Sequence, residues 1–306
     1  MKEQTTVLIA GATGFVGKAL VAHLLELGYK INVLTRNPDK ARLLFPESVG
    51  VIKWPDGNSK LLLSNCRHCD AIINLSGANI GTQRWTQSYK KEILRSRTES
   101  IIQLEDIAKN LPDMPGVWIQ ASAVGFYGAQ TDGFVNEHSP TGKGFLADVV
   151  QQTEQQLQGV NLDGIRKVVL RLGIVISPKG GFLAQMKQAF NLGLGVYPGN
   201  GMQYISWIHL DDLVGIISQS ITNSDYEGII NAVSPNPLPF KNFARWLKKR
   251  TRAILLLPMP AFVFRLLLGA EKTSEMLLAN QRVAPEKLKQ LNYNFRFSTF
   301  DKMEML

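Results

Sequence analysis

Residues 7–18 read Val-Leu-Ile-Ala-Gly-Ala-Thr-Gly-Phe-Val-Gly-Lys, and this stretch predicts the fold of the chain around it. An apolar run ends at Gly11, and Gly14 and Gly17 follow at intervals of three residues. Apolar residues then recur at helical spacing until Gly28, a residue type that commonly ends a helix. A strand, a glycine-rich turn and a helix in this order are the context of a dinucleotide-binding site.

The three glycines have different roles in such a turn. Gly11 allows the tight turn, Gly14 lets backbone N–H groups reach a pyrophosphate, and Gly17 lets helix and strand pack closely. The helix N-terminus would add N–H donors and a partial positive charge. A turn that serves packing alone is the alternative. The predicted cofactor contacts of this turn are Gly11, Thr13, Gly14, Phe15, Val16 and Gly17.

The end of the second predicted strand, residues 30–36, indicates which cofactor is bound. An NAD site usually has a carboxylate there, about 20 residues after the glycines, which binds the ribose 2′-hydroxyl. This chain has Thr35 and Arg36 instead, and no carboxylate before Asp39. Because a guanidinium can bind a 2′-phosphate through two hydrogen bonds, the sequence predicts NADP. A surface arginine at a strand end is the alternative.

Strands and helices alternate along the first part of the chain. Residues 70–78 form an apolar run closed by small residues, which is typical of a strand buried on both faces of a parallel sheet. Leu75, Ser76 and Gly77 would then lie at its carboxyl end, beside the cofactor. The pattern predicts an α/β fold with a doubly wound (Rossmann) parallel sheet and a smaller, mixed C-terminal substrate domain. The predicted boundaries are 1–172 for the NADP-binding domain, with 205–233 returning to it, and 173–306 for the substrate side.

Composition limits the other classes of protein. The chain has 306 residues, 45% of them apolar, as expected of a soluble globular protein. Cys66 and Cys69 form a C-x-x-C without a second ligand pair, so two unrelated thiols are favoured over zinc or a redox pair, and we predict no metal. Because a strand is predicted within six residues of the first residue, we expect no signal peptide, and no clean apolar stretch reaches about 20 residues. We therefore expect a cytoplasmic protein without a membrane partner.

The net charge of +9 raises the question of a polyanionic partner. The basic residues are dispersed, apart from those in residues 90–97 and the Lys-Lys-Arg-Thr-Arg run at 248–252. No nucleic-acid-binding motif accompanies them, and runs of charge usually form solvated helix faces. We therefore expect no nucleic-acid partner, and either a monomer or a homodimer.

Short phrases along nearly the whole chain resemble the atypical short-chain dehydrogenase/reductases that are classed as nucleotide-sugar epimerases. They include Ala-Ser-Ala-Val-Gly-Phe-Tyr-Gly at 121–128 and the segments 11–17, 74–77, 84–85, 96–97, 170–175, 180–181, 206–213 and 281–288. Residues of about 251–300 resemble the family's small C-terminal segment. The resemblance implies an NADP-dependent epimerase or oxidoreductase that acts on a small carbonyl- or hydroxyl-bearing substrate, with a nucleotide sugar as one candidate.

The Tyr-x-x-x-Lys pair that this superfamily usually uses for catalysis is absent. On the helix predicted at 144–157 it would fall on Leu146 and Val150, or one residue earlier on Phe145 and Val149. The candidates that remain near the nicotinamide are Ser122, Tyr127 and Arg97. Tyr127 would be the acid/base if a cation such as Arg97 lowered its pKa, and Ser122 would orient the substrate oxygen. A packing tyrosine and a strand-end serine are the alternatives.

Three functions stay open at this point: an NADP-dependent enzyme, a non-catalytic NADP(H)-binding or redox-sensing module, and a polyanion-binding protein. A nucleotide-sugar enzyme would need a cation for the substrate phosphates in the second crevice, and Arg171, Lys179 and Arg282 are candidates. For His209, ahead of a predicted helix, a structural role is favoured.

Overall fold

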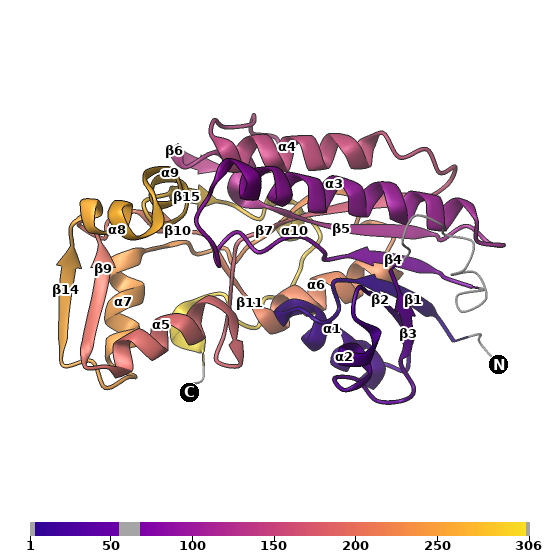
Figure 1. The fold of residues 1–306 in the computed structure, drawn as a ribbon, viewed down its shortest axis with the longest axis horizontal. Coiled ribbons are helices and arrows are strands. Elements are labelled where there is room, and N and C mark those ends of the chain that lie inside the picture. Colours follow the sequence, from indigo (N-terminus) through magenta and orange to yellow (C-terminus); the bar gives the residue numbers. More distant parts are fainter. Residues whose placement is uncertain (1–3, 55–67, 304–306) are drawn as a thin grey trace.

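A seven-stranded parallel sheet forms one end of the molecule (Figure 1). The computed structural model of the chain describes residues 4–54 and 68–303. The strands of this sheet are β1 (Thr6–Ala10), β2 (Lys30–Thr35), β3 (Gly50–Lys53), β4 (Ala71–Asn74), β5 (Val117–Ala123), β7 (Arg166–Leu172) and β12 (Gly228–Ala232). Their order is β3-β2-β1-β4-β5-β7-β12, and all neighbours are parallel. The predicted doubly wound α/β fold is confirmed, and its strand order reverses between β1 and β4, where such sheets bind ligands.

Helices cover both faces of this sheet (Figure 1). On one face Leu20 and Leu24 pack with Ile216, and on the other Ile101 and Leu104 pack on the strands. Each of these side chains stabilises the fold by roughly 1.5–3 kcal/mol through burial. The helices of this half are α1 (Phe15–Glu26), α2 (Pro38–Arg42), α3 (Gln87–Lys109), α4 (Phe145–Gln158), α6 (Leu210–Thr222) and α10 (Glu286–Gln290), with the short η2 (Val124–Tyr127) after β5.

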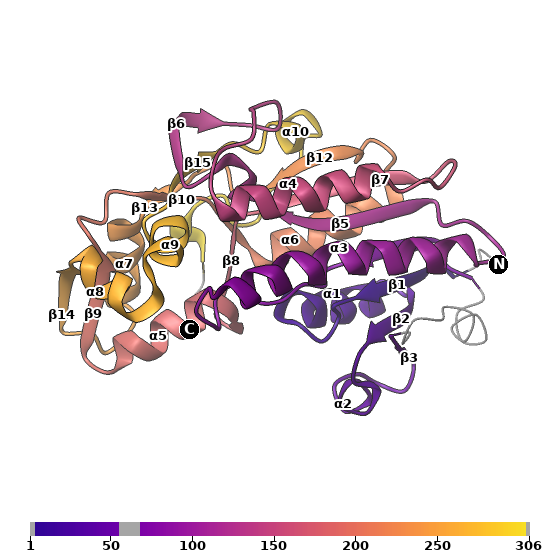
Figure 2. The same cartoon turned by 45° about the horizontal axis from the view of Figure 1, so that its top comes forward.

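The other end of the molecule is built mostly from the chain after β7 (Figure 2). Its aromatic core contains Phe190, Trp207, Phe243 and Phe300. Small two-stranded sheets pair β6 with β15, β8 with β11, β9 with β14 and β10 with β13. The elements are β6 (Gln130–Val135), β8 (Ile174–Ser177), α5 (Gly181–Asn191), β9 (Leu194–Pro198), β10 (Tyr204–Ile205), β11 (Trp207–His209), β13 (Leu238–Pro239), α7 (Phe240–Lys248), β14 (Leu255–Met259), α8 (Ala261–Leu268), α9 (Ala270–Lys272), η3 (Thr273–Leu277), β15 (Asn280–Val283) and η4 (Phe300–Lys302).

Two strands differ from their sequence predictions. The strand expected at 70–78 ends at Asn74, because the side chain of Asn74 accepts a hydrogen bond from Ser76 N and turns the chain. Residues 204–208, whose apolar pattern predicts one strand, are divided at Ser206 between β10 and β11, which pair with different partners. The Ser206 hydroxyl donates to Gln281 O and accepts from Val283 N, so it joins this break to β15. The predicted boundary at residue 172 stays a prediction.

Of the C-x-x-C pair, Cys66 lies outside the described residues, and Cys69 is buried with its thiol donating to Ala71 O. Within the described ranges, every helix is too short or too polar to cross a lipid bilayer. Across the same ranges, no group of three or more His, Cys, Asp or Glu side chains is placed to hold a metal ion.

Candidate cofactor and substrate site

Two glycines of the β1–α1 turn are required by the protein's own packing. Gly11 has a φ of +80°, which strains any residue with a side chain. A Cβ on Gly11 would lie 2.6 Å from the carbonyl carbon of Leu75, and one on Gly17 would lie 2.5 Å from Gly11 O. Both distances are far below van der Waals contact, so these glycines hold β1, β4 and α1 together.

Neither backbone strain nor close packing explains why residue 14 is a glycine. It is the N-cap of α1 with a φ of −75° and a ψ of 176°, a conformation that any residue adopts. Among the described residues outside its immediate neighbours, only Gly11 O comes within 4 Å of an added Cβ, at 3.2 Å, and Gly14 is exposed. No side chain caps α1, and its first turn contains no acidic residue. The turn therefore presents backbone N–H donors on an open side, which fits an anionic ligand.

A second glycine pair lies against this turn. A Cβ on Gly180 would be 2.9 Å from the ring of Phe15, and one on Gly181 would be 2.8 Å from it. The turn between β8 and α5 can therefore cover the Phe15 ring only because both residues lack side chains. Sequence reasoning noted the two glycines as part of a resemblance but did not identify this contact.

Arg36 follows directly after β2 and is exposed. Within the described part of the chain its guanidinium makes no hydrogen bond or ion pair. The nearest carboxylate in the sequence, Asp39, is bound to Arg42 at 2.9 Å. The end of β2 thus has a cation whose charge is not neutralised, at the position that the sequence analysis assigned to the 2′-phosphate.

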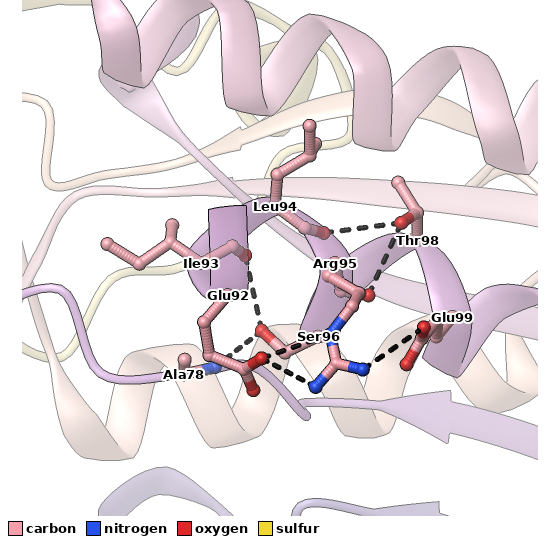
Figure 3. A network of polar contacts seen from close by, with 8 residues as sticks. All are labelled: Ala78, Glu92, Ile93, Leu94, Arg95, Ser96, Thr98 and Glu99. Carbon is pink, nitrogen blue, oxygen red and sulfur yellow. Dashed lines mark hydrogen bonds and ion pairs between the residues drawn. The ribbon is translucent and has the colours of Figure 1, made fainter. Parts of the chain in front are cut away.

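The loop after β4, Leu75 to Gly77, is held from both sides. Leu75 N donates to Ala10 O of β1, and a Cβ on Gly77 would lie 3.0 Å from the guanidinium carbon of Arg97. The loop continues to Ala78, whose N–H donates to the Ser96 hydroxyl at 2.9 Å (Figure 3). These contacts fix the loop along the carboxyl ends of β1 and β4, where the sequence predicted it.

Arg97 is half-buried under this loop. Its Nη1 donates to Ala78 O at 3.2 Å and to Ile93 O at 2.8 Å. Burial lowers the pKa of Arg97, and nearby Tyr89 offsets this only in part. Arg97 is thus bonded to backbone carbonyls of the loop and of α3, and in the described part of the chain it makes no hydrogen bond with Tyr127.

Two other cations of the basic cluster at 90–97, Lys90 and Arg95, are paired with carboxylates. Arg95 donates to Glu92 at 2.8 Å and lies 3.7 Å from Glu99 (Figure 3), and Lys90 binds Glu271 at 2.6 Å. These ion pairs account for Lys90 and Arg95 without a polyanionic ligand.

Tyr127 belongs to a buried network centred on Arg171. The guanidinium of Arg171 binds both carboxylate oxygens of Glu154, at 2.9 and 2.7 Å, and donates to the Tyr127 hydroxyl at 3.0 Å. Tyr127 donates in turn to Asn231 Oδ1 at 2.8 Å, and the Ser122 hydroxyl donates to Glu154 at 2.6 Å. Tyr127 is only 3% exposed. One network therefore joins β5, η2, α4, β7 and β12.

The surroundings of Tyr127 in this network shift its pKa in the direction opposite to the one that an acid/base role needs. Burial raises the pKa of Tyr127, while Arg171 and the hydrogen bond to Asn231 lower it by less, so the pKa lies above its usual value. The cation that contacts the phenol is Arg171, where the sequence analysis had suggested Arg97. Arg171 itself is fully buried against Glu154, so the idea that it binds substrate phosphates in an open crevice is wrong.

The remaining candidates have structural contacts. The guanidinium of Arg282 lies over the ring of Tyr204 at 4.0 Å. His209 is the N-cap of α6, with Nδ1 accepting from Asp211 N at 3.2 Å. The centroid of its ring lies 3.7 Å from that of Phe297, with the two rings tilted by 35°. Asp212 accepts hydrogen bonds from the backbone of Arg296 and Phe297, which fastens the C-terminal segment to α6.

The segment after α8 holds the start of α4 and the loop between β4 and α3 in place. Glu275 accepts from Phe145 N and Leu146 N at 2.8 and 2.7 Å, so its carboxylate caps α4. Lys272 donates to Gly81 O and Gln83 O at 2.7 and 2.8 Å, which fixes the loop between β4 and α3. Sequence reasoning missed these residues, because neither forms a motif with the elements that it contacts.

Comparison with known proteins identifies the family. The model of the NAD dependent epimerase/dehydratase family matches residues 7–232, and that of a domain of unknown function, DUF1731, matches residues 259–303. The chain therefore belongs to the NAD dependent epimerase/dehydratase family, and it carries the C-terminal domain that the resemblance had placed at about 251–300.

Individual relatives agree with this assignment. The epimerase family protein SDR39U1 homolog of Arabidopsis thaliana, described as chloroplastic, is 36% identical over 97% of this chain and 84% of that protein. The crystal structure of human SDR39U1 (isoform 2) with NADPH has a TM-score of 0.85 at 30% identity, covering 97% of both chains. A nucleoside-diphosphate sugar epimerase from Corynebacterium glutamicum has a TM-score of 0.74 at 30% identity, covering 97% of this chain and 56% of that chain.

Proposed function

We propose that this protein binds NADP(H) at the β1–α1 turn and uses it on a small substrate that carries a carbonyl or hydroxyl group. The observation that carries the proposal is the unneutralised guanidinium of Arg36 at the end of β2, on the same sheet edge as the open N-terminus of α1. The NADPH in the human relative's structure supports the same choice of cofactor.

Each part of the cofactor has a matching group in the chain. The N–H donors around Gly14 would bind the pyrophosphate, and Arg36 would bind the ribose 2′-phosphate. The loop from Leu75 to Gly77 would lie along the cofactor at the carboxyl end of β4. When bound, the nicotinamide supplies hydride exchange, and the protein contributes binding, orientation and proton transfer.

For proton transfer we propose Tyr127, with Ser122 orienting the substrate oxygen. Arg171 would hold the phenol in place, and Arg97 would supply positive charge behind the loop at Gly77. The Tyr127 hydroxyl would serve as the proton donor, and Arg171, at 3.0 Å, would stabilise the phenolate that remains. The raised pKa of Tyr127 opposes this role. A nucleotide sugar is the substrate class that we favour, because the C. glutamicum relative is named as an epimerase of such compounds.

A second candidate function is a non-catalytic NADP(H)-binding module. It is favoured by the Tyr127 hydroxyl, which is already bonded on both sides by Arg171 and Asn231. It is also favoured by Leu146 and Val150 in α4, where the superfamily pair would stand. Turnover of NADPH or NADP with a panel of carbonyl compounds and nucleotide sugars separates the two candidates. Cytoplasmic location and a monomeric or homodimeric state stay predictions from the sequence.

The cofactor assignment is tested by changing Arg36 to Ala. Loss of hydrogen bonds to a charged group should weaken NADP binding by roughly 1.5–3 kcal/mol and leave NAD binding nearly unchanged. Arg42→Ala is the matched control, since Arg42 is an exposed arginine already paired with Asp39. Both cofactors are titrated by calorimetry. Equal loss for NADP and NAD would mean that Arg36 supports the loop and does not bind the phosphate.

A further inference from the structure

The outer face of the β9–β14 pair is apolar and exposed, at the end of the molecule away from the seven-stranded sheet (Figure 1). Leu194 pairs in register with Leu255, and Leu257 follows two residues later on the same face. At the start of the pair, Ile254 N donates to Gly193 O at 2.8 Å, which places Ile254 opposite Gly193, the residue that follows Leu192. We call this surface the apolar edge; it consists of Leu192, Leu194, Ile254, Leu255 and Leu257.

Internal packing does not account for the apolar edge. On the opposite face of β14, Leu256 packs against the aromatic core of this half. On the apolar edge, Leu192 is 88% exposed and Ile254 is 77% exposed. A contiguous exposed patch of large apolar side chains usually marks an interaction site.

Charges around the apolar edge are all of one sign. Residues 164–210 and 228–270, which include α5, β9, α7, β14 and α8, contain no Asp or Glu. The second range contains Lys241, Arg245, Lys248, Lys249, Arg250, Arg252 and Arg265. Lys249 and Arg252 are exposed, and Arg252 N donates to Asn191 Oδ1 at 3.2 Å, directly beside Leu192. The most exposed part of the edge is therefore flanked by unneutralised cations.

We propose that the apolar edge docks on an anionic lipid surface. Its leucine and isoleucine side chains enter the boundary between headgroups and acyl chains, while the basic run at 248–252 contacts the lipid phosphates. From the sequence we expected no membrane partner, because no stretch is long and apolar enough to span a bilayer. Docking on the surface of a bilayer does not need such a stretch.

Charge and shape favour a lipid surface over a second copy of the chain. A symmetric contact through the edge would bring two basic runs together, on chains that each have a net charge of +9. The edge also lies at one end of the long axis of the molecule (Figure 1), and a bilayer accepts a projecting edge without a complementary groove.

Binding of the full chain to vesicles tests this proposal. Vesicles of phosphatidylcholine alone and of equal parts phosphatidylcholine and phosphatidylglycerol are sedimented with the protein at low and at high salt. We expect binding to the anionic vesicles at low salt, and weaker binding at high salt because exposed charges are screened. Equal binding to both kinds of vesicle, or none to the anionic ones, would overturn the proposal.

Paired variants locate the contact. Leu192→Glu with Ile254→Glu should lower the partition coefficient at least tenfold, whereas Leu43→Glu, at a position 88% exposed in the other half, should not. Lys249→Gln with Arg252→Gln should lower it roughly 30-fold, from the usual contribution of two cations near an anionic surface. Lys30→Gln with Arg42→Gln removes the same charge elsewhere and serves as control.

Two further results would contradict the proposal. If Leu43→Glu reduced vesicle binding as much as the edge variant, the contact would not lie at the edge. If the protein instead formed a concentration-dependent dimer that Leu192→Glu with Ile254→Glu abolished, the edge would belong to a second copy. Unchanged melting temperatures, expected for such exposed positions, show that the variants remain folded.

Discussion

The β1–α1 turn and the network around Arg171 lie at the same sheet but differ in how their polar groups are used. At the turn, the first N–H groups of α1 have no capping side chain and Arg36 has no carboxylate partner among the described residues. In the network, Arg171, Glu154 and Tyr127 bond to one another, and burial excludes water. The turn has binding capacity left for a ligand, whereas the polar groups of the network are already bonded to one another. Substitutions in the two regions should therefore have different consequences.

The largest effect is expected for Arg171→Met. This change leaves the Glu154 carboxylate buried without its partner, which typically costs about 3–5 kcal/mol in the free energy of unfolding. The double variant with Glu154→Leu should recover much of that loss, because it removes both charges together. Urea denaturation of the single and double variants measures this. An Arg171→Met protein as stable as the parent would show that the network contributes no stability.

Tyr127→Phe distinguishes the two roles proposed for this residue. If Tyr127 only bonds Arg171 and Asn231, the variant should lose about 1–3 kcal/mol in stability and keep its turnover. If it is the acid/base, turnover should fall about 10²–10⁴-fold while NADP binding is kept. Steady-state kinetics on a substrate from the panel, together with denaturation, measures both. Retained turnover would show that Tyr127 has only a structural role, as a hydrogen-bond partner of Arg171 and Asn231.

At the turn, Gly14→Val and Gly17→Val should separate ligand approach from packing. Gly14→Val should lower NADP affinity at least tenfold, or about 1.4 kcal/mol, and leave the fold intact, because the added side chain lies on the open side. Gly17→Val should also destabilise the protein, since its Cβ would lie 2.5 Å from Gly11 O. Calorimetric titration and thermal melting distinguish the two. Unchanged NADP affinity in Gly14→Val would mean that the cofactor does not approach there.

The smallest effect is a pH dependence through His209. Burial lowers the pKa of His209, outweighing the opposite influence of Asp211, and Arg296 and Lys179 lower it further. As pH falls from the unfolded value of about 6.5, the unfolded chain binds this proton first, so stability should decrease until the folded pKa is passed. The slope should be at most about 1.4 kcal/mol per pH unit, the value for one proton.

His209→Asn keeps an N-cap acceptor for α6 and removes the titrating group. The slope of stability against pH in that window should therefore be flatter in the variant than in the parent. A parent slope that His209→Asn leaves unchanged would assign the dependence to other groups. Asp212, whose pKa is raised by burial, acts in the opposite direction at lower pH and is common to both proteins.

The sequence predicted the turn well and the network poorly, for a physical reason. Gly11 and Gly17 act through backbone geometry that is local in sequence, so their spacing alone indicates their roles in the turn and in packing, while the role of Gly14 toward the cofactor stays a prediction. Arg171 and Glu154 meet only because β7 and α4 pack on each other, and neither residue is marked by its neighbours in the sequence. The same holds for Glu275, which caps α4 from 130 residues away.

The short strands of the smaller half could not be predicted from the sequence either. β9 and β14 are far apart in the chain and pair in parallel, and their glycine- and proline-rich surroundings suggest loops. The two alternatives that the sequence raised for Tyr127 remain separate hypotheses, because a buried, fully bonded hydroxyl fits packing while its position at the end of β5 fits chemistry.

The central claim is that this protein binds NADP(H) and distinguishes it from NAD(H) through the charge at the end of β2. Calorimetric titration of the unmodified chain with NADPH and with NADH tests it most directly. We expect saturable binding of NADPH that is at least tenfold tighter than that of NADH, from the charged contact of Arg36 with the 2′-phosphate. Binding of NADH as tight as that of NADPH, or no binding of either, would contradict the account.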